Sequence, residues 1–130
     1  MKTCRVTIVD TGHILLDQAE VALGGWQRLR GLIGRKGLPP SEGLLIPHCS
    51  SVHTFFMRFP IDVVYLSKDD RVVKIVDDMR SCRVSACLKA QSVLEMPAGW
   101  ARKTGLRAGH ALAFRDTPEP PAPPAGEPSA

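Results

Sequence analysis

Three side chains of the kind that enzymes use for proton transfer stand among apolar residues in this sequence: Asp62, Glu95 and His53. Asp62 and Glu95 each lie inside a short run of β-type residues, 61–66 and 92–96. A carboxylate among apolar neighbours must be hydrogen-bonded, ion-paired, exposed at a strand end, or shifted in pKa. Two such groups with split pKa values can perform general acid–base catalysis. One alternative is therefore a hydrolase or lyase with Asp62, Glu95 and His53 as catalytic residues.

A structural role for both acids is the interpretation that we favour over catalysis. Asp62 could pair with Arg58 or with an arginine elsewhere, and Glu95 could end a strand at the surface. Ion pairing perturbs carboxylates as strongly as catalytic sites do. Nothing in the sequence shows that the two acids meet in space.

Arginines supply a second candidate chemistry, the binding of an anion. Arg28, Arg35 and Arg58 are the candidate ligand-binding residues, because a planar guanidinium donates paired hydrogen bonds to carboxylate or phosphate. The first functional prediction is a small binding or accessory domain that holds an anionic small molecule or a protein segment near Arg58 and Asp62. A solvated helix face is the simpler explanation for the arginines that precede residue 36.

Thiols and imidazoles form a third set, which comprises His48, Cys49 and His53 in one segment and Cys82 and Cys87 in another. They could bind zinc, but their spacing lacks the paired two-residue gaps of strong zinc sites. A nucleophilic Cys49 with a histidine base and a disulfide between Cys82 and Cys87 are further alternatives. We expect no metal site and no cofactor.

The length and composition of the chain are those of one globular domain. The chain has 130 residues, 44% of them hydrophobic, and a net charge of +4. No run approaches the ~18 to 20 apolar residues of a membrane span, and residues 1–10 lack the apolar stretch of a secretory signal. We therefore expect a cytoplasmic monomer that does not bind membranes. Aromatic residues are only 5% of the chain and mostly fit a core, so nucleic acid is not an expected partner.

Alternating and apolar runs predict short strands along most of the chain. The safest hairpin joins 61–66 to 71–76, and a second joins 3–9 to 13–22. The remaining predicted strands are 44–46, 53–57, 92–96 and 110–114, with a long loop over 77–91 and a helical turn at 100–103.

One amphipathic helix is predicted over residues 25–35, where apolar residues fall on one face. The proline-rich end of the chain contains no large apolar residue and is predicted to be flexible. These elements predict an α+β domain of mainly antiparallel sheet, rolled into a small barrel-like structure, over residues 1–115, with a disordered tail over 116–130.

Four motifs, taken in order, resemble a known family. They are Arg28-x-x-Gly31-Leu32-Ile33-Gly34-Arg35, Glu42-Gly43-Leu44-Leu45, Phe55-Phe56-Met57-Arg58 followed by Pro60-Ile61-Asp62, and Leu94-Glu95-Met96-Pro97-Ala98-Gly99. Their type, order and spacing are similar to those of the family called domain of unknown function 192, from about Val6 to Phe114. The resemblance implies a compact, mainly β domain with no established biochemical activity.

Two positions depart from the family pattern. The family often has tryptophan, methionine, lysine and asparagine in the central motif, where this chain has residues 56–59 with the sequence Phe-Met-Arg-Phe. Near the end, the family commonly has aspartate after a glycine, and this chain has His110 after Gly109. A role of that aspartate in relatives therefore does not pass to His110.

Overall fold

The computed structural model describes residues 2–22 and 35–117. In these residues the elements are, in chain order, β1 (Thr3–Ile8), β2 (Ile14–Val21), β3 (Glu42–Pro47), β4 (Ser51–His53), β5 (Ile61–Leu66), β6 (Val72–Met79), β7 (Val84–Ala86), β8 (Ser92–Pro97), α2 (Trp100–Thr104) and β9 (Leu112–Asp116). None of the helices in this part of the chain is long and apolar enough to cross a membrane.

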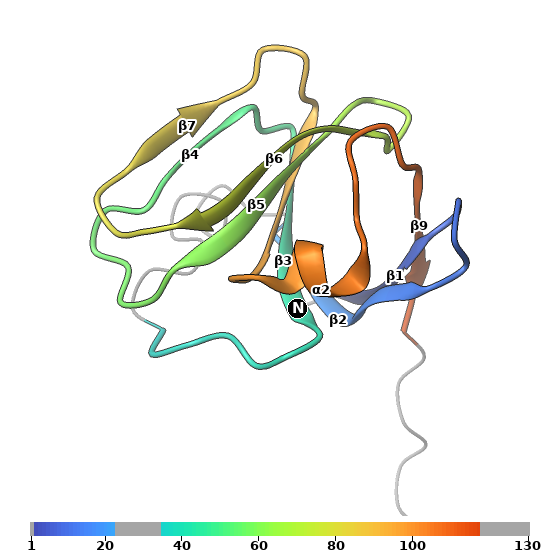
Figure 1. Ribbon diagram of the computed structural model, residues 1–130, viewed down its shortest axis with the longest axis horizontal. Coiled ribbons are helices and arrows are strands. Elements are labelled where there is room, and N and C mark those ends of the chain that lie inside the picture. Colours follow the sequence, from blue (N-terminus) through green and yellow to red (C-terminus); the bar gives the residue numbers. More distant parts are fainter. Residues whose placement is uncertain (1, 23–34, 118–130) are drawn as a thin grey trace, which may run out of the picture.

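The main sheet has seven strands in the order β6-β5-β8-β3-β2-β1-β9 (Figure 1). All neighbours in it are antiparallel except β2 and β3, which are parallel. The predicted β-rich α+β class and both predicted hairpins are confirmed. Parallel neighbours need a crossover connection instead of a tight turn. The long segment between β2 and β3 provides this connection.

The two outer strands of the main sheet meet at one end only. Arg71, just before β6, forms a single bridge with Ala111, just before β9. Two backbone hydrogen bonds make this bridge, from Val72 to the His110 carbonyl at 2.8 Å and from Leu112 to the Asp70 carbonyl at 2.9 Å. The sheet is not closed into a barrel, so the predicted barrel-like closure is not confirmed.

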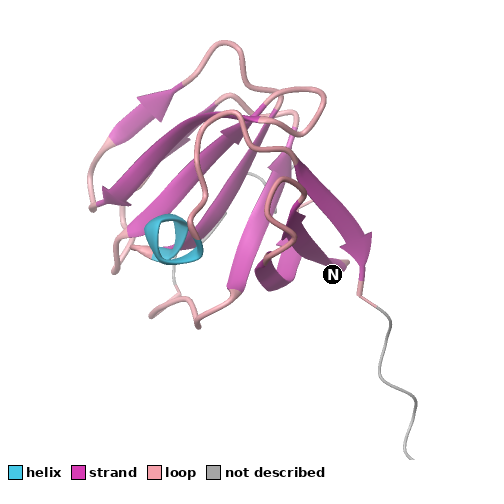
Figure 2. Cartoon of the chain, turned by 45° about the vertical axis from the view of Figure 1, so that its right-hand side comes forward, coloured by secondary structure: helices cyan, strands magenta, loops and turns pink. Residues whose placement is uncertain are grey.

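Both faces of the main sheet are covered, which explains why β5 is buried along its whole length. Alternate residues of a strand point to opposite faces. One face packs a cluster that includes Val64, Leu94 and Met96, and helix α2 lies on it (Figure 2). The indole N–H of Trp100 anchors this helix by donating to the Leu15 carbonyl at 2.6 Å. The second face packs a cluster that includes Val63 and Tyr65.

A two-stranded ribbon made of β4 and β7 lies apart from the main sheet in hydrogen bonding (Figure 1). Val52 and the two thiols Cys49 and Cys87 pack against the cluster on the second face. The Lys74 ammonium of β6 donates to the Ala86 carbonyl at 3.1 Å. The ribbon therefore covers the second face of the sheet.

The ribbon is also where the sequence interpretation was wrong about strand limits. The strand predicted over 53–57 ends at His53, because the chain turns at Phe56, whose φ is 66°. The loop predicted over 77–91 contains the end of β6 and all of β7. Three-residue strands are too short to produce a visible hydrophobic period.

Two predicted elements cannot be compared with the structure in full. The amphipathic helix over 25–35 lies outside the described residues except for Arg35, and the tail over 116–130 lies outside them from residue 118 onward. The helical turn predicted at 100–103 is present as α2 and ends at Gly105, whose φ of 76° suits glycine.

Candidate functional site: buried carboxylates and an exposed ribbon

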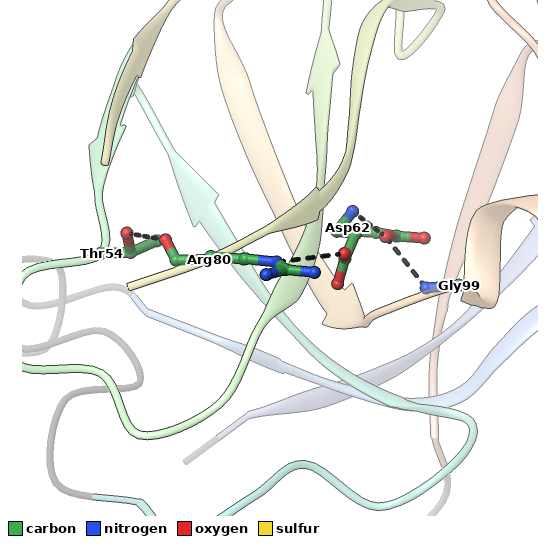
Figure 3. Close-up of polar contacts among 5 residues, drawn as sticks. Thr54, Asp62, Arg80 and Gly99 are labelled. Atoms are coloured by element: carbon green, nitrogen blue, oxygen red, sulfur yellow. Dashed lines mark hydrogen bonds and ion pairs between the residues drawn. The ribbon is translucent and has the colours of Figure 1, made fainter. Parts of the chain in front are cut away.

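Asp62 is fully buried, and backbone N–H groups bind both of its carboxylate oxygens. Its Oδ1 accepts from Gly99 at 3.0 Å (Figure 3). The same oxygen accepts from Asp78 at 2.9 Å, and Oδ2 of Asp62 accepts from Ala101 at 2.9 Å. Charge-assisted bonds of this kind are the strong ones. Asp62 therefore ties the start of helix α2 and the end of β6 to the middle of β5.

Local irregularities in the chain create these donors. The β5–β6 ladder is interrupted between Ile61 and Val63, and Asp78 adopts a φ of 50° there. The Asp78 N–H consequently bonds to the side chain of Asp62. Helix α2 begins at a glycine without a side chain to cap it, so a carboxylate from another strand binds its first N–H groups. Neither Arg58 nor a helix arginine is needed to satisfy Asp62.

Glu95 lies on the strand next to Asp62 but on the other face of the sheet. In the β5–β8 ladder Asp62 is opposite Met96, and Glu95 is opposite Val63. Because successive residues alternate between faces, the two carboxylates point away from each other. The structure does not bring together the acid pair on which the hydrolase or lyase alternative depends.

Burial raises the pKa of Glu95 to about 7, and the nearby Arg35 guanidinium opposes the shift without cancelling it. Arg35 itself forms an ion pair with Glu20, with Nη2 2.6 Å from Oε2. Glu20 and Glu95 lie in one row across the sheet, because both are in register with Leu44. The Arg35 guanidinium thus pairs with Glu20 and interacts electrostatically with Glu95, which leaves it poorly suited to binding an external anion.

A cavity of about 40 Å³ adjoins the ion pair, with room for a few water molecules and none for an organic ligand. It is lined by Thr3, Gln18, Glu20, Arg35, Leu38, Glu42 and Gly43. Arg28, the other arginine predicted to bind a ligand, lies outside the described residues.

His53 and Arg58 are both exposed and lie on or beside the ribbon, whereas both carboxylates are buried in the main sheet. The His53 imidazole stacks on Phe55 with ring centroids 5.2 Å apart. The structure therefore separates His53 from the two acids with which catalysis would need it to act. It places His53 and Arg58 in a region with exposed apolar side chains, two of them phenylalanines, although the sequence interpretation had assigned the aromatic residues mostly to the core.

These apolar side chains are large and unusually open to solvent. The exposed fraction is 41% for Phe55, 84% for Phe56, 69% for Val84 and 96% for Leu88. Val84 is the cross-strand partner of His53, so both project from the side of the ribbon that faces away from the core. We call the exposed side chains of residues 49–60 and 80–90 the ribbon surface.

The ribbon surface is also one-sided in charge. Residues 49–60 and 80–90 contain Arg58, Arg80, Arg83 and Lys89 and no aspartate or glutamate, a charge of +4 that equals the net charge of the whole chain. All four cations are exposed. Arg80 alone has an acidic neighbour in the described residues, Asp78, with Nε 3.7 Å from Oδ2 (Figure 3).

The thiols do not form the predicted alternatives. All four cysteines are free, and the Cys49 thiol donates to the Ser51 carbonyl at 3.0 Å. Across the described residues, no three His, Cys, Asp or Glu side chains are grouped so that they could hold a metal ion. The zinc and disulfide alternatives therefore gain no support.

Sequence reasoning overlooked Thr54, which holds the ribbon together. It is fully buried, its hydroxyl donates to the Arg80 carbonyl, and the Arg83 N–H donates to the same hydroxyl at 2.9 Å. Its backbone N–H donates to the Arg83 carbonyl. A lone threonine before two phenylalanines offered no sequence signal for this role.

The fold and these two features define the class: a mixed β sheet with a carboxylate-capped helix on one face and a basic, apolar ribbon on the other. The chain belongs to the DUF192 family (Uncharacterized ACR, COG1430), whose pattern it matches over residues 6–114. This confirms the resemblance identified from the four motifs.

Two solved structures share the fold. A protein from Sinorhizobium meliloti 1021, described as a candidate transcription regulator, is 21% identical with a TM-score of 0.76, over 87% of this chain and 92% of that one. A protein of unknown function from Novosphingobium aromaticivorans DSM 12444 is 22% identical with a TM-score of 0.73, over 85% of this chain and 83% of that one. No curated protein matches the chain.

Proposed function

We propose that this chain is a binding or accessory domain whose ribbon surface binds an acidic, partly apolar segment of another protein. The observation that carries the proposal is the combination of four exposed large apolar side chains with four cations and no acid in the same two segments. Exposed apolar side chains that gather on one surface mark an interaction site more often than scattered ones do.

Charge decides the kind of partner. A cluster of arginine and lysine in which only Arg80 has an acidic neighbour among the described residues attracts carboxylates and repels basic surfaces, which favours specificity and rapid association. Arginine is also enriched at protein interfaces, where aromatic and apolar side chains supply the buried core of the contact. Phe55, Phe56 and Val84 at one end of the ribbon and Leu88 at the other are suited to such contacts, and Arg58 and Arg83 to their rim.

A small anionic ligand fits the geometry less well. Asp62 is fully buried and its oxygens are occupied, so it cannot take part in a ligand site. Two larger depressions, of about 260 and 250 Å³, share His48 and Gln91 in their linings and include neither Arg58 nor Asp62. We therefore propose a protein segment as the partner and do not propose the hydrolase or lyase alternative.

A peptide-binding experiment tests the proposal. Fluorescein-labelled short peptides that alternate glutamate and leucine are titrated with the protein and followed by anisotropy, beside peptides that replace glutamate by lysine or leucine by serine. We expect only the glutamate–leucine peptide to bind, and Arg58→Glu/Arg83→Glu to weaken binding by about tenfold or more. Phe56→Ser/Leu88→Ser should weaken binding by a similar factor.

The chain offers matched controls for both variants. Arg5→Glu/Arg115→Glu changes two exposed arginines that face each other across β1 and β9. Val9→Ser/Ile14→Ser changes two exposed apolar residues, 58% and 46% exposed, at the β1–β2 hairpin. Equal losses in variants and controls would refute the ribbon surface as the site. Tighter binding to duplex DNA or to phosphatidylserine vesicles than to the peptide would refute a protein segment as the partner.

A further inference from the structure

We infer that the bound segment lies extended beside β4 and adds a third strand to the ribbon. This inference rests on the proposed function and specifies the conformation of the partner. Strand addition to an exposed sheet edge is a general mode of peptide recognition, in which main-chain hydrogen bonds give affinity and alternate side chains give specificity.

The alternation of hydrogen bonds along the β4–β7 ladder shows which backbone N–H and C=O groups point out of the ribbon. Cys87 donates to the Ser50 carbonyl at 2.8 Å, and Thr54 donates to the Arg83 carbonyl at 2.9 Å. These bonds flank the paired residues 51–53 and 84–86. Because bonded pairs alternate along an antiparallel ladder, Ser51 and His53 direct their N–H and C=O groups away from β7.

By the same alternation, the N–H and C=O groups of Val84 and Ala86 point away from β4. Ser51, His53, Val84 and Ala86 are all exposed, and in the described part of the chain each ribbon strand pairs only with the other. An edge of this kind is a template for another strand.

The two edges differ in availability. On the β7 edge the Ala86 carbonyl already accepts the Lys74 ammonium at 3.1 Å. On the β4 edge, among residues 2–22 and 35–117, the Ser51 carbonyl accepts just the Cys49 thiol, a weak donor that another N–H group can replace. Phe55 follows β4 by two residues and its ring stacks on His53, so a strand added here would run beside aromatic side chains, with Arg58 past the turn at Phe56.

The partner is therefore an acidic segment in which apolar and acidic residues alternate. Alternation with a period of two would place its apolar side chains beside the stacked rings of His53 and Phe55, since residues on one face of adjacent strands are neighbours. Its acids would then be free to pair with the cations around the ribbon. A helical segment with the same composition would not match the two-residue period.

Proline substitution tests the edge with a matched control. Ser51→Pro removes an outward N–H from β4 and leaves the β4–β7 ladder bonds in place, and Ala86→Pro does the same on β7. We expect Ser51→Pro to weaken binding of the glutamate–leucine peptide by about fivefold or more and Ala86→Pro to change it by less than about twofold. Equal effects of the two variants, or a larger loss with Ala86→Pro, would overturn the inference.

A second measurement keeps the test decisive if Ser51→Pro does not fold. Peptides that are N-methylated at every second residue, in either of the two phases, are titrated into the unmodified protein. We expect one phase to abolish binding and the other to preserve it, because only one row of peptide N–H groups can face β4. If both phases bind as well as the parent peptide while Phe56→Ser/Leu88→Ser does not, strand addition is wrong and the proposed function stands. If the parent peptide itself does not bind, the proposed function fails.

Discussion

Asp62 and Glu95 are one register position apart on neighbouring strands, and their carboxylates point to opposite faces of the sheet. Three backbone N–H groups bind Asp62, whereas burial keeps the pKa of Glu95 at about 7. Two acids that look alike in sequence therefore have different physical roles. Asp62 holds elements together through hydrogen bonds from three backbone N–H groups, and Glu95 is most easily accommodated in its protonated form.

Asp62→Ala should strongly destabilise the fold. The substitution leaves three N–H groups without their acceptor, and one of them, at Ala101, is buried. Losing several bonds to a charged acceptor should lower the free energy of unfolding by about 3 to 5 kcal/mol, measured by urea denaturation. Hydrogen exchange at Ala101 should accelerate most.

Asp116→Asn is the control for Asp62→Ala. Asp116 pairs with Lys2 at 3.3 Å, and both side chains are largely exposed. An exposed pair contributes little, so we expect a change within about 0.5 kcal/mol. An Asp62→Ala protein as stable as the Asp116→Asn protein would show that the three bonds do not hold helix α2 in place.

Glu95 should make the stability depend on pH in the direction opposite to a paired acid. Its pKa is raised in the folded protein to about 7 from an ordinary value of 4.5, so the folded state binds more protons between these values. The contribution of Glu95 to the free energy of unfolding is therefore fully present below its ordinary pKa of 4.5 and is lost as the pH rises through about 7. The shift corresponds to about 3 kcal/mol at most.

Glu95→Gln should remove this dependence, because the amide imitates the protonated acid. Urea denaturation at pH about 5 and about 8 should show the variant gaining roughly 2 to 3 kcal/mol relative to the unmodified protein at the higher pH. Asp77→Asn, which changes an exposed acid on β6, is the control and should leave the difference between the two pH values unchanged. A Glu95→Gln protein with the same pH profile as the parent would contradict the buried, protonated acid.

Strands that are buried on both faces, and strands in which apolar and polar residues alternate, were predictable from sequence. The run 61–66 was predicted with its observed limits, since five apolar or aromatic residues and one acid leave few other structures possible. The hairpins β1–β2 and β5–β6 followed from short polar turns between such runs. The parallel pairing of β2 with β3 was not predictable, because pairing between distant strands leaves no local pattern.

The site was less predictable than the fold, because exposure of an apolar residue depends on what the rest of the chain covers. Phe55 and Phe56 have the composition of a core strand, but the turn at Phe56 directs both out of the core. The absence of any acid from residues 49–60 and 80–90 was only a weak signal, because residues 21–41 and 96–115 contain no acid either. It was missed because these segments become neighbours only through the β4–β7 pairing.

Thr54→Val should loosen the ribbon selectively. Valine keeps the shape of threonine and removes the hydroxyl that accepts the Arg83 N–H and donates to the Arg80 carbonyl. Leaving these groups without a partner should cost about 1 to 3 kcal/mol. Hydrogen exchange should accelerate across β4 and β7 and change little in β5 and β8. Thr7→Val, at a half-buried position of β1, should produce no such local pattern.

Gly43→Ala should destabilise the centre of the main sheet, where β3 lies between β2 and β8. A Cβ added to Gly43 would lie 2.6 Å from the Glu95 carbonyl oxygen and 2.6 Å from Leu16 Cδ1. The leucine methyl can rotate away, but the carbonyl belongs to the β8 backbone and cannot move without disturbing the β3–β8 ladder. Such overpacking should lower the free energy of unfolding by about 1 to 3 kcal/mol in urea denaturation.

Gly37→Ala is the matched substitution, because a Cβ at Gly37 would meet nothing within 4 Å. Alanine there should be neutral or stabilise by about 0.4 to 1 kcal/mol, since it reduces the freedom of the unfolded chain. If the two variants had the same stability, close approach of the β8 backbone would not explain the glycine at position 43. If Gly43→Ala alone is destabilised, the glycine of the Glu42-Gly43-Leu44-Leu45 motif is required by the spacing between strands and has no direct part in binding.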